Sequence, residues 1–350
     1  MIVYSKASGT SNSAIGKIET PIKMIIEHES DNIRKKGGVA EWLFNIEKSN
    51  RFGESIITQS EFDLFQAAAE GAGAELDTVR DAKTKFIEHV QFMKEFVITA
   101  EMMEDAQNGI AAEAKRRAEN FTRAYYKTMN KLCVAALTSA TNASTTFAKA
   151  TLDLTTSDGY PLFSNAHKYG KNDITQSNYY YGDIFTKTVD GARVLDPTLF
   201  AETLYRLAFY IRDMKDENGE ALGYTADTII LPANRPRLEL MVKQVCGTMY
   251  APGTPNNDIN VHYGNWNIIV LPGWNATNDS IMVMSSEANK HLSGNMLFNR
   301  VPLTVSNWID YHTGNYIWNG RCRFGVGFGS YKHILLATDT EQTLQNGSKM

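Results

Sequence analysis

The clearest periodic pattern in the chain lies between residues 108 and 138. Apolar side chains recur there at steps of three and four residues, from Ile110 to Ala136, while polar side chains occupy the opposite side. This spacing predicts one amphipathic helix of about thirty residues, roughly 45 Å long at 1.5 Å per residue. Because helices of this length are uncommon in globular proteins, we expect it to act as a structural rod.

Two stretches before this helix show a strand pattern instead. Residues 55–65 have a partial period of two, and residues 85–99 are rich in aromatic and β-branched side chains. Residues 67–74, between them, are rich in alanine and glycine. The pattern predicts two long strands joined by a flexible tip. Since a two-stranded hairpin is marginal alone, it needs a partner within the chain or from a neighbour.

Residues 1 to about 36 resemble an arm. Ile22, Met24, Ile25 and Ile26 supply apolar surface between a small polar stretch and a charged stretch that ends in two glycines. This surface is too small to fold alone, so we expect the arm to pack against another part of the protein.

The region after the long helix begins with irregular structure. Residues 139–192 are polar and turn-rich, which predicts short strands between loops. Asp196 followed by Pro197 predicts the start of a second helix, with Asp196 as its cap, and Asn218-Gly219 predicts its end. A third helix follows, for which Asn234 is the expected cap.

Strand patterns dominate the rest of the chain. Apolar runs predict strands at 228–231, 266–271 and 280–284. From Val301 the pattern again favours strands, and residues 321–336 alternate through three glycines. The last ten residues are polar, and we expect them to be frayed.

Composition narrows the class of protein. The chain has 350 residues, with 35 Lys and Arg against 39 Asp and Glu, and 43% of the residues are hydrophobic. It is therefore globular, and the net charge of −4 argues against nucleic-acid binding by bulk positive charge.

Cysteine usage and hydropathy bear on the compartment. The three cysteines are far apart and form no CxxC pair, which argues against a zinc site and against a disulfide framework. No signal peptide and no apolar run of membrane-spanning length is present. We expect a soluble protein, made in a reducing cytoplasm, with no membrane partner.

Candidate chemistry is weak. The run Gly325–Gly329 lacks the G-x-G-x-x-G spacing and no helix pattern follows it, so strand glycines at a close backbone approach are favoured over a phosphate loop. Ser164 and His167 are close in sequence, but no G-x-S-x-G elbow surrounds the serine. Lys115-Arg116-Arg117 is basic, yet Glu113 and Glu119 share its helix, which favours a solvated face or a subunit contact. We assign no catalytic, cofactor-binding or metal-binding residue.

Several short segments along the chain carry distinctive motifs. Asp158–His167 has the sequence DGYPLFSNAH, residues 44–49 are FNIEKS, and residues 96–105 are FVITAEMMED. Further segments are DTIILP at 227–232, NDIN at 257–260 and RCRFGVG at 321–327. These segments resemble those of tailed-bacteriophage major capsid proteins, including the Mu-like head subunits. The strongest, DGYPLFSNAH, is similar to their DG-x-x-LFS-x-x-H segment, FNIEKS resembles their F-x-VEKS motif, and FVITAEMMED resembles the stretch ahead of their long helix. The order and spacing of these segments span residues 40–337.

The resemblance implies an α+β chain with the Hong Kong 97-type capsid fold. Its parts would be an N-terminal arm at 1–50, a projecting hairpin called the E-loop at 51–100, a peripheral domain at 101–190 with its spine helix at about 108–138, an axial domain at 191–297, return strands of the peripheral domain at 298–340 and a C-terminal tail at 341–350.

The implied function is structural. Such a chain forms hexamers and pentamers that close an icosahedral shell around packaged double-stranded DNA, without sequence-specific binding. The resemblance also implies a portal and a decoration protein as partners, and, because little precedes the arm, a separate scaffolding protein. The expected location is the virion, after assembly in the host bacterial cytoplasm.

Apolar residues of the hairpin are the expected contacts between subunits. We predict that other chains partly bury these side chains: Phe62, Leu64, Phe86, Phe92 and Phe96. Two alternatives stay open from the sequence, an encapsulin-like nanocompartment shell with the same fold and a hydrolase that uses Ser164 and His167.

Overall fold

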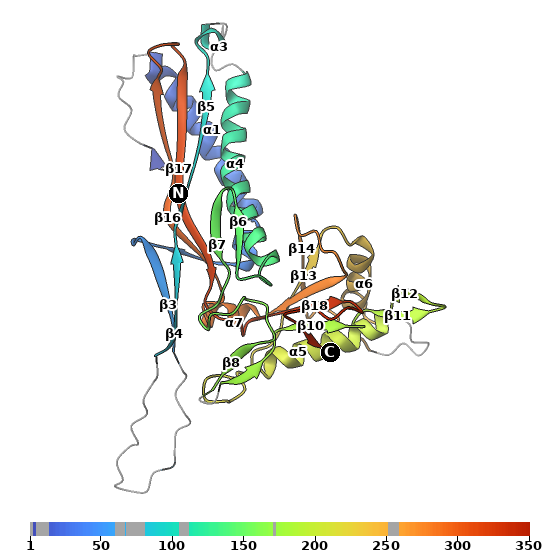
Figure 1. The fold of residues 1–350 in the computed structure, drawn as a ribbon. Coiled ribbons are helices and arrows are strands. Elements are labelled where there is room, and N and C mark those ends of the chain that lie inside the picture. Colours follow the sequence, from blue (N-terminus) through green and yellow to red (C-terminus); the bar gives the residue numbers. More distant parts are fainter. Residues whose placement is uncertain are drawn as a thin grey trace. The chain divides into compact units, whose positions relative to one another are not determined.

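The chain folds into two compact units in the computed structural model (Figure 1). The structure describes residues 3–4, 14–59, 67, 81–104, 112–170, 173–250 and 259–350. The first unit comprises Met1–Glu54, Ile87–Cys133 and Leu297–Val326, and the second comprises Ser55–Phe86, Val134–Met296 and Gly327–Met350. Each unit is thus built from segments that are far apart in the sequence.

The first unit packs two helices on a sheet. Its sheet has the order β1-β16-β17-β5, with β2 also paired to β16. The strands are β1 Val3–Tyr4, β2 Asn45–Lys48, β5 Val90–Ile98, β16 Asn295–Ile309 and β17 Tyr316–Phe328. Helices α1 Ala14–Lys36 and α4 Ala112–Thr138 lie side by side, and α2 Val39–Leu43 and α3 Ala100–Glu104 are short (Figure 1).

The core of the first unit confirms the helix expected at 108–138. Ala114, Ala118 and Phe121 of α4 are buried against Trp318 of β17. The helix is described from Ala112, since residues 105–111 lie outside the described part of the chain. The three- and four-residue steps of the sequence therefore mark the buried face correctly.

Helix α1 is a feature that the sequence pattern did not indicate. Its residues Ile22 and Ile26, four positions apart, are fully buried in the same core. Ser30 Oγ lies 2.6 Å from the Tyr126 hydroxyl oxygen of α4. The arm therefore packs on the long helix of its own chain, which explains how so small an apolar surface becomes ordered.

The second strand expected in the hairpin, at residues 85–99, is divided between two strands in the structure. β3 Gly53–Gln59 pairs with β4 Asp81–Glu88, whereas β5 pairs with β17, so the single strand expected at 85–99 is wrong. The break is at His89, whose buried ring lies 2.8 Å from Ser49 Oγ through Nε2. A Cβ on Gly325 of β17 would lie 2.7 Å from the Glu88 carbonyl oxygen. The chain changes partners where these backbones meet.

The second unit contains a six-stranded sheet of the order β14-β13-β15-β18-β10-β19. Its strands are β10 Tyr179–Gly182, β13 Thr228–Pro232, β14 Asn267–Leu271, β15 Ser280–Met284, β18 Ile334–Asp339 and β19 Ser348–Lys349. Its helices are α5 Pro197–Arg212, α6 Pro236–Gly247 and α7 Ser286–His291. The strands expected at 228–231, 266–271 and 280–284 are confirmed as β13, β14 and β15.

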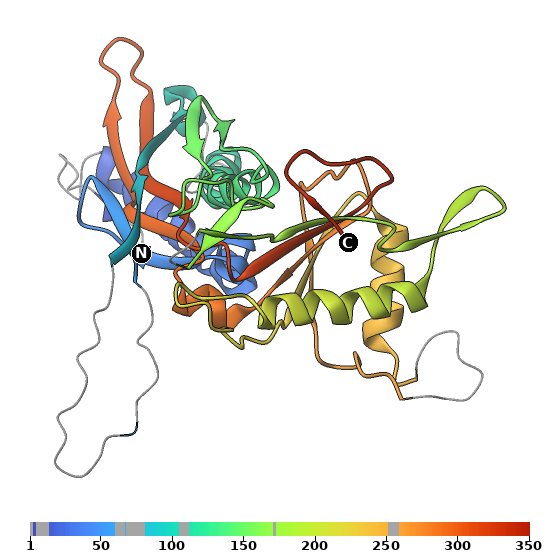
Figure 2. The same ribbon diagram turned by 60° about the horizontal axis from the view of Figure 1, so that its bottom comes forward.

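Three small hairpins accompany this sheet, as the turn-rich pattern of 139–192 predicts. They pair β6 Ser144–Phe147 with β7 Ala150–Asp153, β8 His167–Tyr169 with β9 Ile174–Gln176, and β11 Thr186–Val189 with β12 Ala192–Leu195. Figure 2 shows the β11–β12 hairpin extending away from α5 and the sheet of the second unit.

Of the three helix boundaries that the sequence predicts in the second unit, one is correct and two are wrong. Asp196 caps α5, because its side chain accepts hydrogen bonds from the backbone of Thr198 and Leu199. However, α5 ends at Arg212, well before Asn218. Asn234 does not cap α6: its amide bonds to the backbone of Ala276 in both directions, at 2.9 and 3.1 Å.

The C-terminal residues are ordered, so the expected frayed end is wrong. β19 pairs in parallel with β10, and the Met350 amide donates to the Tyr181 carbonyl at 2.9 Å. The free edge of β10 supplies backbone partners, which a polar segment can use as well as an apolar one. Within the described residues, no helix is long and apolar enough to cross a membrane.

Candidate functional site

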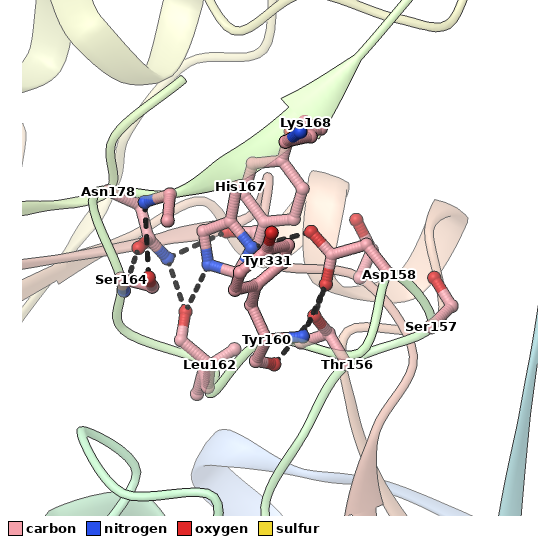
Figure 3. Close-up of polar contacts among 12 residues, drawn as sticks. Thr156, Ser157, Asp158, Tyr160, Leu162, Ser164, His167, Lys168, Asn178 and Tyr331 are labelled. Carbon is pink, nitrogen blue, oxygen red and sulfur yellow. Dashed lines mark hydrogen bonds and ion pairs between the residues drawn. The ribbon is translucent and has the colours of Figure 1, made fainter. Parts of the chain in front are cut away.

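The segment Asp158–His167 folds around a buried ion pair (Figure 3). His167 Nδ1 lies 2.7 Å from Asp158 Oδ2, and the two side chains are 0% and 3% exposed. The other ring nitrogen lies 3.1 Å from the Leu162 carbonyl oxygen. Both ring nitrogens thus face oxygen acceptors, which fixes the orientation of the ring and closes the segment on itself.

Further contacts hold Asp158 in its charged form. Its Oδ1 accepts hydrogen bonds from Thr156 Oγ1 at 2.5 Å and from the Tyr160 amide at 3.2 Å. Burial by itself raises the pKa of Asp158, but the bonds from His167, Thr156 and Tyr160 together hold that pKa below its usual value. On the other side, the Tyr331 ring stacks on His167 at 3.8 Å with an interplanar angle of 4°. The hydrogen bonds and the ring stack together hold the Asp158 and His167 side chains in one packed arrangement.

Asn178 connects this segment to the six-stranded sheet. Its side-chain oxygen accepts from the Ser164 amide at 2.9 Å, and its amide group donates to the carbonyls of Leu162 at 2.6 Å and Ile334 at 3.2 Å. Asn178 is fully buried. The sequence carried no signal for this role, because Asn178 belongs to no periodic element and buried amides look like exposed ones in a sequence.

The geometry gives no support to a Ser/His hydrolase. Ser164 is buried, and its Oγ accepts a hydrogen bond from the Ala166 amide at 3.1 Å. His167 directs its ring nitrogens to Asp158 and to the Leu162 carbonyl. Neither nitrogen is therefore available to take a proton from Ser164, which a nucleophilic serine requires.

The same segment holds the base of the β3–β4 hairpin. The buried Lys85 amine lies 2.6 Å from Thr155 Oγ1 and 2.5 Å from an Asp153 carboxylate oxygen. Thr58 Oγ1 donates to Ser157 Oγ at 2.8 Å. Both strands of the hairpin are therefore tied to residues 153–157, next to the Asp158–His167 pair, and these contacts lie within the second unit.

The predicted contact residues are found in different surroundings. Phe62 and Leu64 lie outside the described residues. Phe86 of β4 is 50% exposed. Phe92 stacks on Phe324 with ring centroids 4.7 Å apart.

Phe96 packs against the core of the first unit. Its ring stacks on Trp318 at 6.0 Å and lies 5.0 Å from the Phe121 ring. Phe92 and Phe96 thus pack on their own chain, each with part of its surface still accessible. Their contact with other chains stays a prediction.

Gly325 and Gly329 serve close backbone approach, as expected. A Cβ on Gly329 would lie 2.4 Å from the Ser293 carbonyl oxygen, and β17 is followed by strand β18 from Ile334 rather than by a helix. Among the described residues, no group of three or more His, Cys, Asp or Glu side chains is placed to hold a metal ion.

The three cysteines are free and buried. They are Cys133, Cys246 and Cys322. Burial raises the pKa of each thiol, to about 12 for Cys246 and Cys322. None is suited to act as a nucleophile near neutral pH, because the reactive thiolate form is disfavoured.

Comparison with known proteins identifies the class. The family model described as phage capsid protein matches residues 81–337. The chain belongs to this phage capsid protein family. No curated protein matches the sequence.

Solved capsids share the fold. The capsid structure of cyanophage P-SCSP1u matches with a TM-score of 0.52 and 8% identity, over 87% of this chain and 89% of that chain. The capsid of Myoviridae phage XM1 matches with a TM-score of 0.50 and 11% identity, over 87% and 92%. The fold is the Hong Kong 97-type capsid fold, and the chain is a major capsid protein of a tailed phage.

Proposed function

We propose that copies of this chain assemble as hexamers and pentamers into an icosahedral shell that encloses packaged double-stranded DNA. The family match over residues 81–337 carries this proposal. The expected partners are a separate scaffolding protein, a portal and a decoration protein, and the expected place of assembly is the host bacterial cytoplasm. A structural role without catalysis agrees with the occupied nitrogens of His167.

The β3–β4 hairpin supports contacts between copies. Its two strands form a sheet of their own. Ile57 on β3 is 54% exposed and Phe86 on β4 is 50% exposed. A two-stranded sheet with apolar side chains in water gains stability when a neighbouring surface covers it. A projecting element on one copy and a receiving surface on the next make a heterologous contact, which closes into a ring when the rotation permits.

Negative-stain microscopy of the full-length chain tests the proposal. Uniform icosahedral or tubular particles are the expected result. A small discrete oligomer under all assembly conditions, with or without the phage's other proteins, would overturn it.

The encapsulin-like alternative shares the fold but encloses no genome. Particles purified from producing cells distinguish the two shells. Nuclease-protected duplex DNA of defined length supports the phage shell, whereas an enclosed protein cargo without DNA supports the nanocompartment.

A further inference from the structure

The solvent-facing side of α4 carries evenly spaced cations. Along one side of the helix the exposed side chains are Arg116, Asn120, Arg123, Lys127 and Lys131. The distance along the axis from Arg116 to Lys131 is roughly 22 Å at 1.5 Å per residue. We call the four cations of this set the α4 basic face. Of the sequence run Lys115-Arg116-Arg117, only Arg116 belongs to this face: Lys115 is exposed but lies about 100° away around the helix, and Arg117 donates to the Val97 carbonyl of β5.

Acidic neighbours only partly neutralise this face. Arg116 pairs with Glu113 at 2.5 Å, and Arg123 pairs with Glu29 of α1 at 2.5 Å. The cation of each pair is more than half exposed. Lys127 and Lys131 form no ion pair with a described residue. Because exposed ion pairs are weak, Arg116 and Arg123 can exchange their carboxylate partners for another anion.

The charge of the whole chain divides unequally between the two units. The first unit has 18 Lys and Arg against 15 Asp and Glu, a net charge of +3. The second has 17 against 24, a net charge of −7. The mild negative charge of the chain thus conceals a basic unit, and the α4 basic face belongs to it.

The composition of this face favours a polyanion over a protein surface. None of the large hydrophobic side chains exposed in the described part of the chain lies on α4. Protein interfaces are centred on buried aromatic and apolar anchors, which this face lacks. Contacts to a nucleic-acid backbone need cations alone and carry no sequence information.

We propose that the α4 basic face contacts the phosphates of duplex DNA weakly and without sequence specificity. This inference rests on the proposed function, in which the shell encloses DNA. Four cations predict a slope of log K against log salt of about −3.6, so raising salt from 50 to 200 mM weakens binding about 150-fold. Such contacts hold DNA loosely enough for it to slide during packaging.

Fluorescence anisotropy of a labelled random-sequence 30-base-pair duplex with the unassembled full-length chain measures this slope. The test variant is Lys127→Gln with Lys131→Gln, which removes two cations from an exposed helix face. The matched control is Lys187→Gln with Lys290→Gln, two exposed lysines of the second unit. The test variant should lower the magnitude of the slope by about 1.8, and the control should leave it unchanged.

Three results would overturn the inference: no binding at 50 mM salt, equal slopes for the test and control variants, or preference for an acidic peptide over the duplex. Electron microscopy of the wild-type chain and of the same two variants tests the proposed function separately. Shells that form normally while the slope does not change would reject the DNA contact alone. Absence of shells from the wild-type chain, together with the expected slopes, would reject the proposed shell alone.

Discussion

Asp158 and His167 show what a single pair of residues contributes to this fold. The pair is buried, its hydrogen bonds are satisfied by Thr156, Tyr160 and Leu162, and it lies next to the residues that hold the hairpin base. A buried pair of this kind is weak support for high stability, but removing one partner leaves an uncompensated charge.

Replacing His167 with Phe should therefore destabilise the chain strongly. Phe can keep the stack on Tyr331, but it leaves the Asp158 carboxylate buried without its main partner. We expect a loss of about 3–5 kcal/mol in the free energy of unfolding, measured by urea denaturation followed by circular dichroism. His312→Phe, at an exposed turn, is the control and should change stability by less than about 0.5 kcal/mol. Equal stabilities would contradict the structural role of the pair.

The depressed pKa of Asp158 predicts a pH dependence of stability. A carboxylate whose pKa is lower in the folded state stabilises the fold above its unfolded value, about 3.9, and this contribution is lost as pH falls towards the folded value. Between pH 5 and 3, the melting temperature of Asp158→Asn should therefore fall less than that of the wild type. Asp190→Asn, at an exposed turn, should behave as wild type does. Parallel melting curves for Asp158→Asn and wild type would count against this account.

Helices and strands differ in how far their own residues determine where they lie in the fold. Helix α4 has a complete apolar face, so its existence follows from periodicity. The β4–β5 break at His89 has no such signature in the sequence, because the phenylalanine residues occupy even-numbered positions on both sides of it, although the buried positions change from Lys85 and Ile87 in β4 to Ile98 in β5. The two strands also have different partners, β3 and β17. A strand pattern tells which face is apolar, but it does not tell which strand lies alongside.

The Lys85 contacts should govern how firmly the hairpin base is held. Lys85→Met removes the bonds to Thr155 and Asp153, while its unbranched side chain can fill much of the same space. We expect roughly tenfold faster hydrogen exchange in β3 and β4, which corresponds to about 1.4 kcal/mol, and no change in α4. Thr84→Ala, an exposed change on the same strand, is the control. Unchanged exchange in Lys85→Met would show that other contacts hold the hairpin.

At the scale of the whole molecule, the exposed apolar side chains are the surfaces that other copies of the chain can bury. Ile57 and Phe86 lie on paired strands and are about half exposed, so they add little to the stability of the isolated subunit. Burying them in a shell would stabilise each contact, and the effect repeats at every copy.

The double variant Ile57→Ala with Phe86→Ala should fold normally yet assemble poorly. The matched control is Ser55→Ala with Thr84→Ala, which alters two exposed polar side chains on the same two strands. Thermal unfolding should be similar for both variants, whereas electron microscopy should show fewer complete shells for the apolar pair only. Normal shell yields from both variants would mean that this face of the hairpin stays in solvent.

The sequence by itself determined the long helix, the α5 cap at Asp196, three central strands and, through the order of its motifs, the capsid class. These features are local or depend on spacing along one chain. Only the tertiary structure decided that α1 packs on α4, that the chain changes partners at His89 and that Asn178 joins Asp158–His167 to the sheet. The physical reason is that each of these features depends on a partner far away in the sequence. Ile22 is buried in a core that includes α4, the Glu88 carbonyl lies against Gly325, and the buried Asn178 amide donates to the Leu162 and Ile334 carbonyls.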